Sequence, residues 1–202
     1  MRCQTLVALF ASLLLAGVLN AKSPSWKKHT VMEQGHCNTA VAIDANGDKL
    51  MDVVASVSGK VSLFIAPDFT KEVVLHRFTA GGNCIHSTTI DVDGDGDLDW
   101  AGTIASDHPF WLENPGIENA SKGAWAARPI DTVITGIHCL LTSDIDNDGK
   151  DDLVINNFLP DDGLKDSMAW FSVPKDPYRA PNWDRHVFAL GDARGGSHYM
   201  GA

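Results

Sequence analysis

The chain has 202 residues with 26 acidic and 16 basic side chains, which give a formal net charge of −10. That charge argues against a nucleic-acid partner and against an anionic membrane surface, because both are themselves negatively charged. There are four cysteines, and Cys3 lies in a predicted leader, so the odd number that remains excludes a full disulfide framework. We expect Cys37, Cys84 and Cys139 to be buried free thiols.

The first 21 residues have the pattern of a secretory signal peptide. Met1-Arg2 is followed by an apolar run from Leu6 to Val18 and then by the small residue Ala21. The run is short for crossing a bilayer, and a retained anchor is the alternative. We therefore expect a mature domain over residues 22–202, with no transmembrane segment after cleavage, that is secreted, periplasmic or on the cell surface.

The first predicted strand is "WKKHTV" (26–31), and similar stretches follow at "WAARPI" (125–130) and "WDRHVF" (183–188). The three share a leading tryptophan, a basic residue at the fourth place or next to it, and an apolar ending. The less regular "FTKEVVLHRF" (69–78) is the corresponding segment of the first unit. These stretches predict one recurring outer strand.

Three acidic loops in identical register hold half of the acidic residues of the chain: "DANGDKLMD", "DVDGDGDLD" and "DIDNDGKDD". Oxygen side chains stand at positions 1, 3, 5 and 9, while position 7 varies, so a ligand common to the loops at position 7 must be a backbone carbonyl. Calcium takes six to eight hard oxygens in adaptable geometry, whereas zinc prefers His or Cys and magnesium demands a strict octahedron. The predicted ligands are Asp44, Asn46, Asp48, Leu50 and Asp52; Asp91, Asp93, Asp95, Asp97 and Asp99; and Asp144, Asp146, Asp148, Lys150 and Asp152.

An EF-hand is excluded, because position 12 of these loops is Ala55, Gly102 or Ile155 in place of the bidentate glutamate. Short β-type runs such as "AVAI" and "VVASV" flank each loop, so each joins two strands. A further apolar stretch, "VSLFIA", "PFWLEN" or "MAWFSV", precedes the outer strand. Each unit is thus four short strands with a loop after the first, and the loops recur after 47 and 53 residues, the size of a propeller blade.

These loops and strands resemble the FG-GAP/VCBS repeats of calcium-binding β-propellers, the kind also seen in integrin α-chain heads. The resemblance covers nearly the whole mature chain. It implies an all-β fold, a partial β-propeller of about three four-stranded blades plus an N-terminal closing strand at 26–31, with Ca²⁺ at loop positions 1, 3, 5, 7 and 9. Asn46 and Lys49 depart from the repeat pattern, so we expect the first site to be the weakest.

The predicted units span about 32–80, 81–134 and 135–190, with the start of a fourth at 195. Because the chain opens on a lone outer strand and ends where a new first strand would begin, we expect it to be the N-terminal part of a larger propeller. Such a segment needs further blades of its own chain, since an open arc leaves sheet faces uncovered at both ends.

Four of the eight histidines recur at the head of a unit: His36, His86, His138 and His198. In a propeller the first strand lines the central channel, so these imidazoles are candidates for a pocket at the channel mouth that binds a second metal or acts in acid–base catalysis. The alternative is that each satisfies backbone groups where one blade meets the next. His86 is the least regular in offset.

The expected function is that of a secreted, calcium-stabilised binding module for carbohydrate or another extracellular protein. The alternative is a metal-assisted polysaccharide lyase or sugar dehydratase that uses the histidine-lined channel mouth. Fold alone does not decide between the two. No Ser/His/Asp order, nucleophilic cysteine signature or phosphate-binding loop points to other chemistry.

Overall fold

The computed structural model describes residues 26–79, 82–104, 107–158 and 166–191. Its described residues form twelve strands and no helix, so none of them supplies a helix able to span a bilayer. The predicted leader over residues 1–21, the predicted fourth unit and His198 lie outside the described residues. The fold is all-β, as the alternating apolar pattern predicts.

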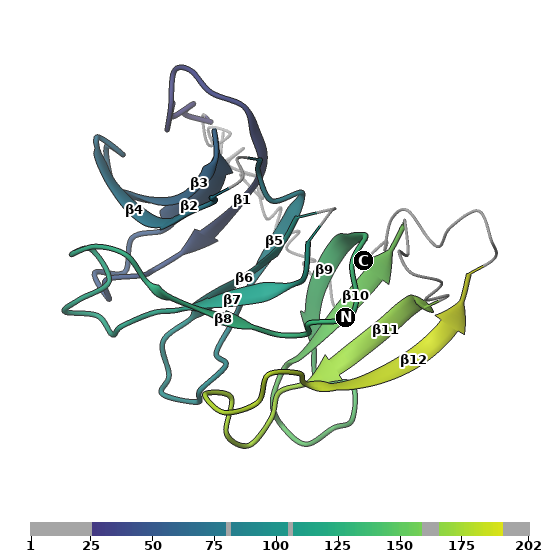
Figure 1. Cartoon of the computed structure of the whole chain (residues 1–202). Coiled ribbons are helices and arrows are strands. Elements are labelled where there is room, and N and C mark those ends of the chain that lie inside the picture. Colours follow the sequence, from purple (N-terminus) through teal and green to yellow (C-terminus); the bar gives the residue numbers. More distant parts are fainter. Residues whose placement is uncertain (1–25, 80–81, 105–106, 159–165, 192–202) are drawn as a thin grey trace, which may run out of the picture.

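The strands form three antiparallel sheets of four, arranged as an open arc (Figure 1). In every sheet the strands are hydrogen-bonded in sequence order, so each sheet is a simple up-and-down meander. The first sheet contains β1 (Cys37–Ile43), β2 (Asp52–Val57), β3 (Lys60–Ile65) and β4 (Lys71–Arg77). The second contains β5 (His86–Ile90), β6 (Asp99–Thr103), β7 (Phe110–Glu113) and β8 (Ala126–Pro129). The third contains β9 (Ile137–Ser143), β10 (Asp152–Asn157), β11 (Asp166–Ser172) and β12 (Asp184–Leu190).

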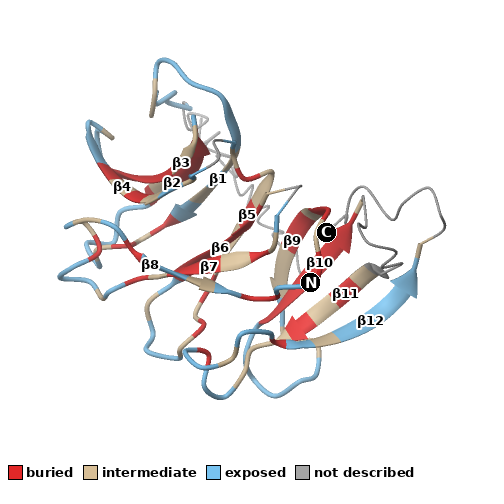
Figure 2. Ribbon diagram, in the orientation of Figure 1, coloured by how far each residue is buried: buried red, intermediate tan, exposed pale blue. Residues whose placement is uncertain are grey.

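The first strands of the three sheets, β1, β5 and β9, lie next to one another along the inner side of the arc (Figure 1). Thr39 on β1 and Ser87 on β5 share a hydrogen bond of 2.8 Å between their hydroxyl oxygens. The strand β12 forms an outer edge and is mostly exposed, whereas the facing sheet surfaces are buried (Figure 2). Three propeller-type blades therefore stand side by side, and their arc is not closed.

The sheets pack face to face because successive side chains of a strand point to opposite faces of its sheet. One face can therefore contact the preceding sheet and the other face the following sheet. Two buried clusters result: one joins Val54 and Leu63 of the first sheet to Trp100 of the second, and the other joins Trp111 to the third sheet. Trp100 fills the space above Gly102, where an added Cβ would lie only 2.2 Å from the indole. The size of Trp100 thus explains the glycine two residues later.

The tryptophan that opens an outer strand anchors its sheet to the sheet before. The backbone N–H of Trp125 donates to the carbonyl of Leu75 at 3.0 Å, and that of Trp183 donates to the carbonyl of Ile130 at 2.8 Å. Both side chains are buried between sheets.

The expected closing strand does not form, since residues 26–36 contain no strand and Trp26 is 99% exposed. The reason is that no preceding sheet exists among the described residues to accept the backbone of Trp26 and bury its indole. Residues of this segment instead lie against the outer face of the first sheet, where Val31 and Met32 pack against Val57 and its neighbours. The expectation for the cysteines holds for Cys84 and Cys139, which are buried and free, but Cys37 is exposed.

Candidate metal centre

The three acidic loops occupy equivalent places, each between the first and second strand of a sheet. Because the inner strands run in the same sense, the loops gather at the same end of the three sheets (Figure 1). The sequence prediction that each loop joins two strands is therefore confirmed.

Within each loop the acidic side chains fold the backbone around themselves through one repeated hydrogen-bond pattern. The carboxylate at position 1 accepts the N–H of position 6: Lys49 to Asp44 at 2.9 Å, Gly96 to Asp91 at 3.2 Å and Gly149 to Asp144 at 3.1 Å. The side chain at position 3 accepts the N–H of position 5, and position 5 accepts that of position 7. Side-chain acceptors for local N–H groups hold a turn in place.

This winding demands a left-handed backbone at positions 4 and 6 of every loop. The second loop meets the demand with glycine at both places, while the first uses Gly47 and Lys49 (φ 68°) and the third uses Asn147 (φ 61°) and Gly149. Lys49 thus adopts a conformation that costs a residue with a side chain about 1–2 kcal/mol. Lys49 therefore raises the conformational energy of the first loop, but the backbone of this loop follows the same path as in the other two loops.

The last aspartate of each loop, Asp52, Asp99 or Asp152, is buried and braces the loop against its sheet. Asp99 accepts the backbone N–H of Val92 at 2.9 Å and that of Asn114 at 2.7 Å. Burial raises the pKa of Asp99 to about 8, and it raises the pKa of Asp52 and Asp152 as well. With a pKa of about 8, Asp99 keeps its proton at neutral pH unless a cation replaces that proton.

Carboxylate oxygens converge in the second and third loops. One oxygen from each of Asp91, Asp93 and Asp99 lies within 4.8 Å of the others, and the same holds for Asp144, Asp146 and Asp152. In the first loop, where position 3 is an asparagine, two carboxylate oxygens are buried without a hydrogen-bond partner: Oδ1 of Asp44 and Oδ2 of Asp52. Unpaired buried oxygens are costly unless a cation or water lies among them. An oxygen-only donor set of this kind fits a hard cation such as calcium and does not fit zinc or copper.

The residue at position 7 differs from loop to loop, and so does the exposure of its side chain. Leu50 is 43% exposed and Lys150 is exposed, whereas the Asp97 side chain is half-buried with its Oδ1 atom unpaired. Burial, with Asp95 and the other nearby carboxylates, raises the pKa of Asp97 to about 6. Sequence reasoning assigned only the backbone carbonyl of Asp97 to the site. Its side chain adds one more negative charge beside the second loop.

Sequence reasoning missed a contact between Tyr178 and the second loop. Tyr178 lies in the connection between β11 and β12, and its hydroxyl donates to Oδ2 of Asp93 at 2.5 Å. No feature of the surrounding stretch "DPYRAP" marks it, because the partner is 85 residues away in the sequence.

Three of the histidines at the heads of the units lie among the described residues, and His36, His86 and His138 stand at the end of the inner strands away from the loops. His86 is half-buried: its Nδ1 accepts the backbone N–H of Leu140 at 3.2 Å, and its Nε2 lies 3.6 Å from Sγ of Cys139. Burial, and then the nearby His138, lowers its pKa. The His138 ring meets Phe158 edge-on at 5.8 Å, and the backbone carbonyl of His36 accepts N–H groups. Among the described residues, no metal-type cluster of three side chains includes a histidine.

Comparison with known proteins agrees with this architecture. A family model described as an FG-GAP-like repeat matches residues 44–101, which run from the first acidic loop through the second loop into β6. A search of curated proteins found no match. The matched stretch contains one full loop-to-loop period, the same period that the structure repeats in its three four-stranded sheets. Residues 44–101 are therefore similar to an FG-GAP-like repeat, which is consistent with the partial propeller that the three sheets form.

Proposed function

We propose that this chain is an extracellular propeller module whose three loops bind structural calcium and whose blades bind carbohydrate or another extracellular protein. The observation that carries the proposal is the repetition of one loop at three places, with the same hydrogen-bond pattern and with a buried position-9 aspartate whose pKa is raised. One acidic turn has many explanations, but three in the same register share one demand, a cation that offsets their mutual repulsion.

The residues that would hold calcium are those at positions 1, 3, 5 and 9, together with the carbonyl at position 7. Calcium would supply the positive charge that lets the buried position-9 carboxylates remain ionised. The ion would also join the start and the end of each loop, which fixes the first two strands of the sheet to each other. Calcium in this role is structural and not regulatory.

The FG-GAP-like match supports an extracellular propeller-like module, because such repeats occur typically in extracellular proteins. The lyase or dehydratase alternative depended on free imidazoles. His86 instead accepts a backbone N–H of the neighbouring inner strand, which is the behaviour expected of a residue that joins two blades.

Isothermal titration of the chelated full chain with calcium tests the metal part of the proposal. We expect three equivalents, with magnesium as the control that binds far more weakly. A glycan array probed in calcium and in chelator tests the binding part, and we expect calcium-dependent retention of a carbohydrate class. Fewer than one equivalent of bound calcium would contradict the proposed function.

A further inference from the structure

The connection between the third and fourth strands of a sheet reaches back to the acidic loop of the preceding sheet. In the second sheet this connection brings Ile117 against Gly47 of the first loop, so closely that a Cβ added to Gly47 would lie 2.9 Å from Ile117 Cδ1. In the third sheet it brings Tyr178 to Asp93 of the second loop. The two contacts are equivalent in place, but only the second is a hydrogen bond to a predicted metal ligand.

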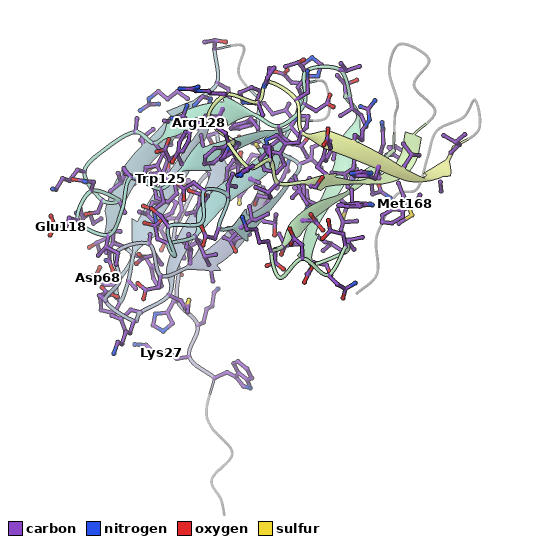
Figure 3. All side chains as sticks on the ribbon, turned by 90° about the horizontal axis from the view of Figure 1, so that it is seen from below. Lys27, Asp68, Glu118, Trp125, Arg128 and Met168 are labelled. Carbon is purple, nitrogen blue, oxygen red and sulfur yellow. The ribbon has the colours of Figure 1, made fainter. Side chains whose placement is uncertain are left out.

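The second sheet holds the Tyr178 ring in a defined position. The guanidinium of Arg128, a residue labelled in Figure 3, lies 4.7 Å from the centre of the tyrosine ring and 5.9 Å from that of Trp111. Arg128 in turn donates Nε and Nη2 to Oε2 of Glu113, at 3.0 and 2.6 Å. Because Glu113 fixes the Arg128 guanidinium and this cation lies over both aromatic rings, the tyrosine ring is held in one position.

The hydroxyl of Tyr178 takes the oxygen of Asp93 that the loop itself leaves free. Oδ1 of Asp93 accepts the N–H of Asp95, as the position-3 side chain does in every loop. Oδ2 accepts the tyrosine hydroxyl, a short bond of the kind formed by an ionised acceptor. Both oxygens are then oriented before any cation arrives. For the equivalent residues Asn46 and Asp146, the described residues supply only the bond within the loop.

We propose that Tyr178 is a positioning residue for the second loop, and that through it calcium occupancy of this loop and docking of the third sheet on the second strengthen each other. This inference rests on the proposed calcium function. A hydrogen bond to a ligand that fixes its orientation is worth roughly 10–100-fold in metal affinity. The coupling is reciprocal, so an ion that holds Asp93 in place also holds Tyr178 and the β11–β12 connection.

The test compares the wild-type full chain with Tyr178→Phe and with the matched variant Ile117→Ala, by competition for calcium against a chromophoric chelator. Phenylalanine keeps the ring on Arg128 and removes only the hydroxyl. We expect Tyr178→Phe to weaken one of the three sites roughly 10-fold and to leave the other two unchanged. Ile117→Ala, which removes packing but no bond to a ligand, should change the affinity of every site by less than about 3-fold.

Hydrogen exchange supplies the second readout. In the wild-type chain calcium should slow amide exchange in the β11–β12 connection around Tyr178, and Tyr178→Phe should reduce that protection while circular dichroism in chelator stays unchanged. Wild-type affinity at all three sites of Tyr178→Phe, or an equal loss at all three, would overturn the positioning role. No calcium binding by the wild-type chain would instead overturn the proposed function itself, and the inference with it.

Discussion

Alanine substitution at position 5 of each loop separates the contribution of metal binding to the free energy of unfolding from the contribution of the loop's own hydrogen bonds. Asp48, Asp95 and Asp148 each accept one N–H from position 7, at 2.8, 3.0 and 2.9 Å, and all three are exposed. The substitutions Asp48→Ala, Asp95→Ala and Asp148→Ala therefore remove the same local hydrogen bond. In chelator each should lower the free energy of unfolding by about 1 kcal/mol.

In calcium the three variants should lose different amounts of stability. A site that binds at about 10 μM in about 1 mM calcium adds roughly 2.7 kcal/mol of stability, which Asp95→Ala or Asp148→Ala should lose. The first loop offers one carboxylate fewer, because position 3 is Asn46. If this weakens binding about tenfold, linkage gives about 1.4 kcal/mol for Asp48→Ala.

The assay is urea denaturation of the full chain, followed by circular dichroism in calcium and in chelator. Equal losses for the three variants under both conditions would refute the metal assignment. A larger calcium-dependent loss for Asp48→Ala than for the other two would refute the ranking of the sites.

Three other predictions concern the backbone, the protons and the core. Lys49→Gly relieves a left-handed φ of 68° and should raise the free energy of unfolding by about 1 kcal/mol; a loss in urea denaturation would contradict the assignment of strain. The folded pKa of Asp99, about 8, lies above its unfolded value, so its contribution to the stability of chelated protein should fall as pH rises from about 4 to 8. Calcium should displace that proton, so calcium titration enthalpies at pH 7 should differ between Tris and PIPES, two buffers of different ionisation enthalpy that bind calcium weakly; equal enthalpies would argue against it. Gly102→Ala should lower the melting temperature by several degrees because its Cβ meets Trp100, whereas Gly123→Ala, with open space around it, should not.

The loops and their place between strands were predictable because both follow from local rules. Oxygen ligands must alternate with small residues to surround one ion, and apolar alternation marks the strands on either side. The sequence therefore predicted the register of all three loops and the number of strands in each sheet. The hydrogen bonds of the position-9 aspartates to the rest of the sheet were not predicted, because they involve residues well outside the loop. Asn114, which donates to Asp99, lies 15 residues further along the chain, just after β7.

Features that depend on distant parts of the chain were predicted wrongly or not at all. The stretch at 26–31 matches two genuine outer strands, yet a strand forms only where a neighbouring sheet accepts its tryptophan. Tyr178 lies in a stretch with no motif and finds Asp93 only because two sheets dock. Likewise the ring of His86, the least regular of the head histidines by offset, accepts a backbone N–H from a neighbouring sheet.

The central claim, that the three loops bind structural calcium, is tested most directly by calorimetry of the full chain in calcium and in chelator. Two sites at about 2.7 kcal/mol and one at about 1.4 kcal/mol sum to about 7 kcal/mol, a large part of the 5–15 kcal/mol that typical domains have. At about 2–4 °C per kcal/mol, calcium should raise the melting temperature by roughly 15–25 °C, and magnesium should not reproduce the rise. A melting temperature that is the same in calcium and in chelator would contradict the account.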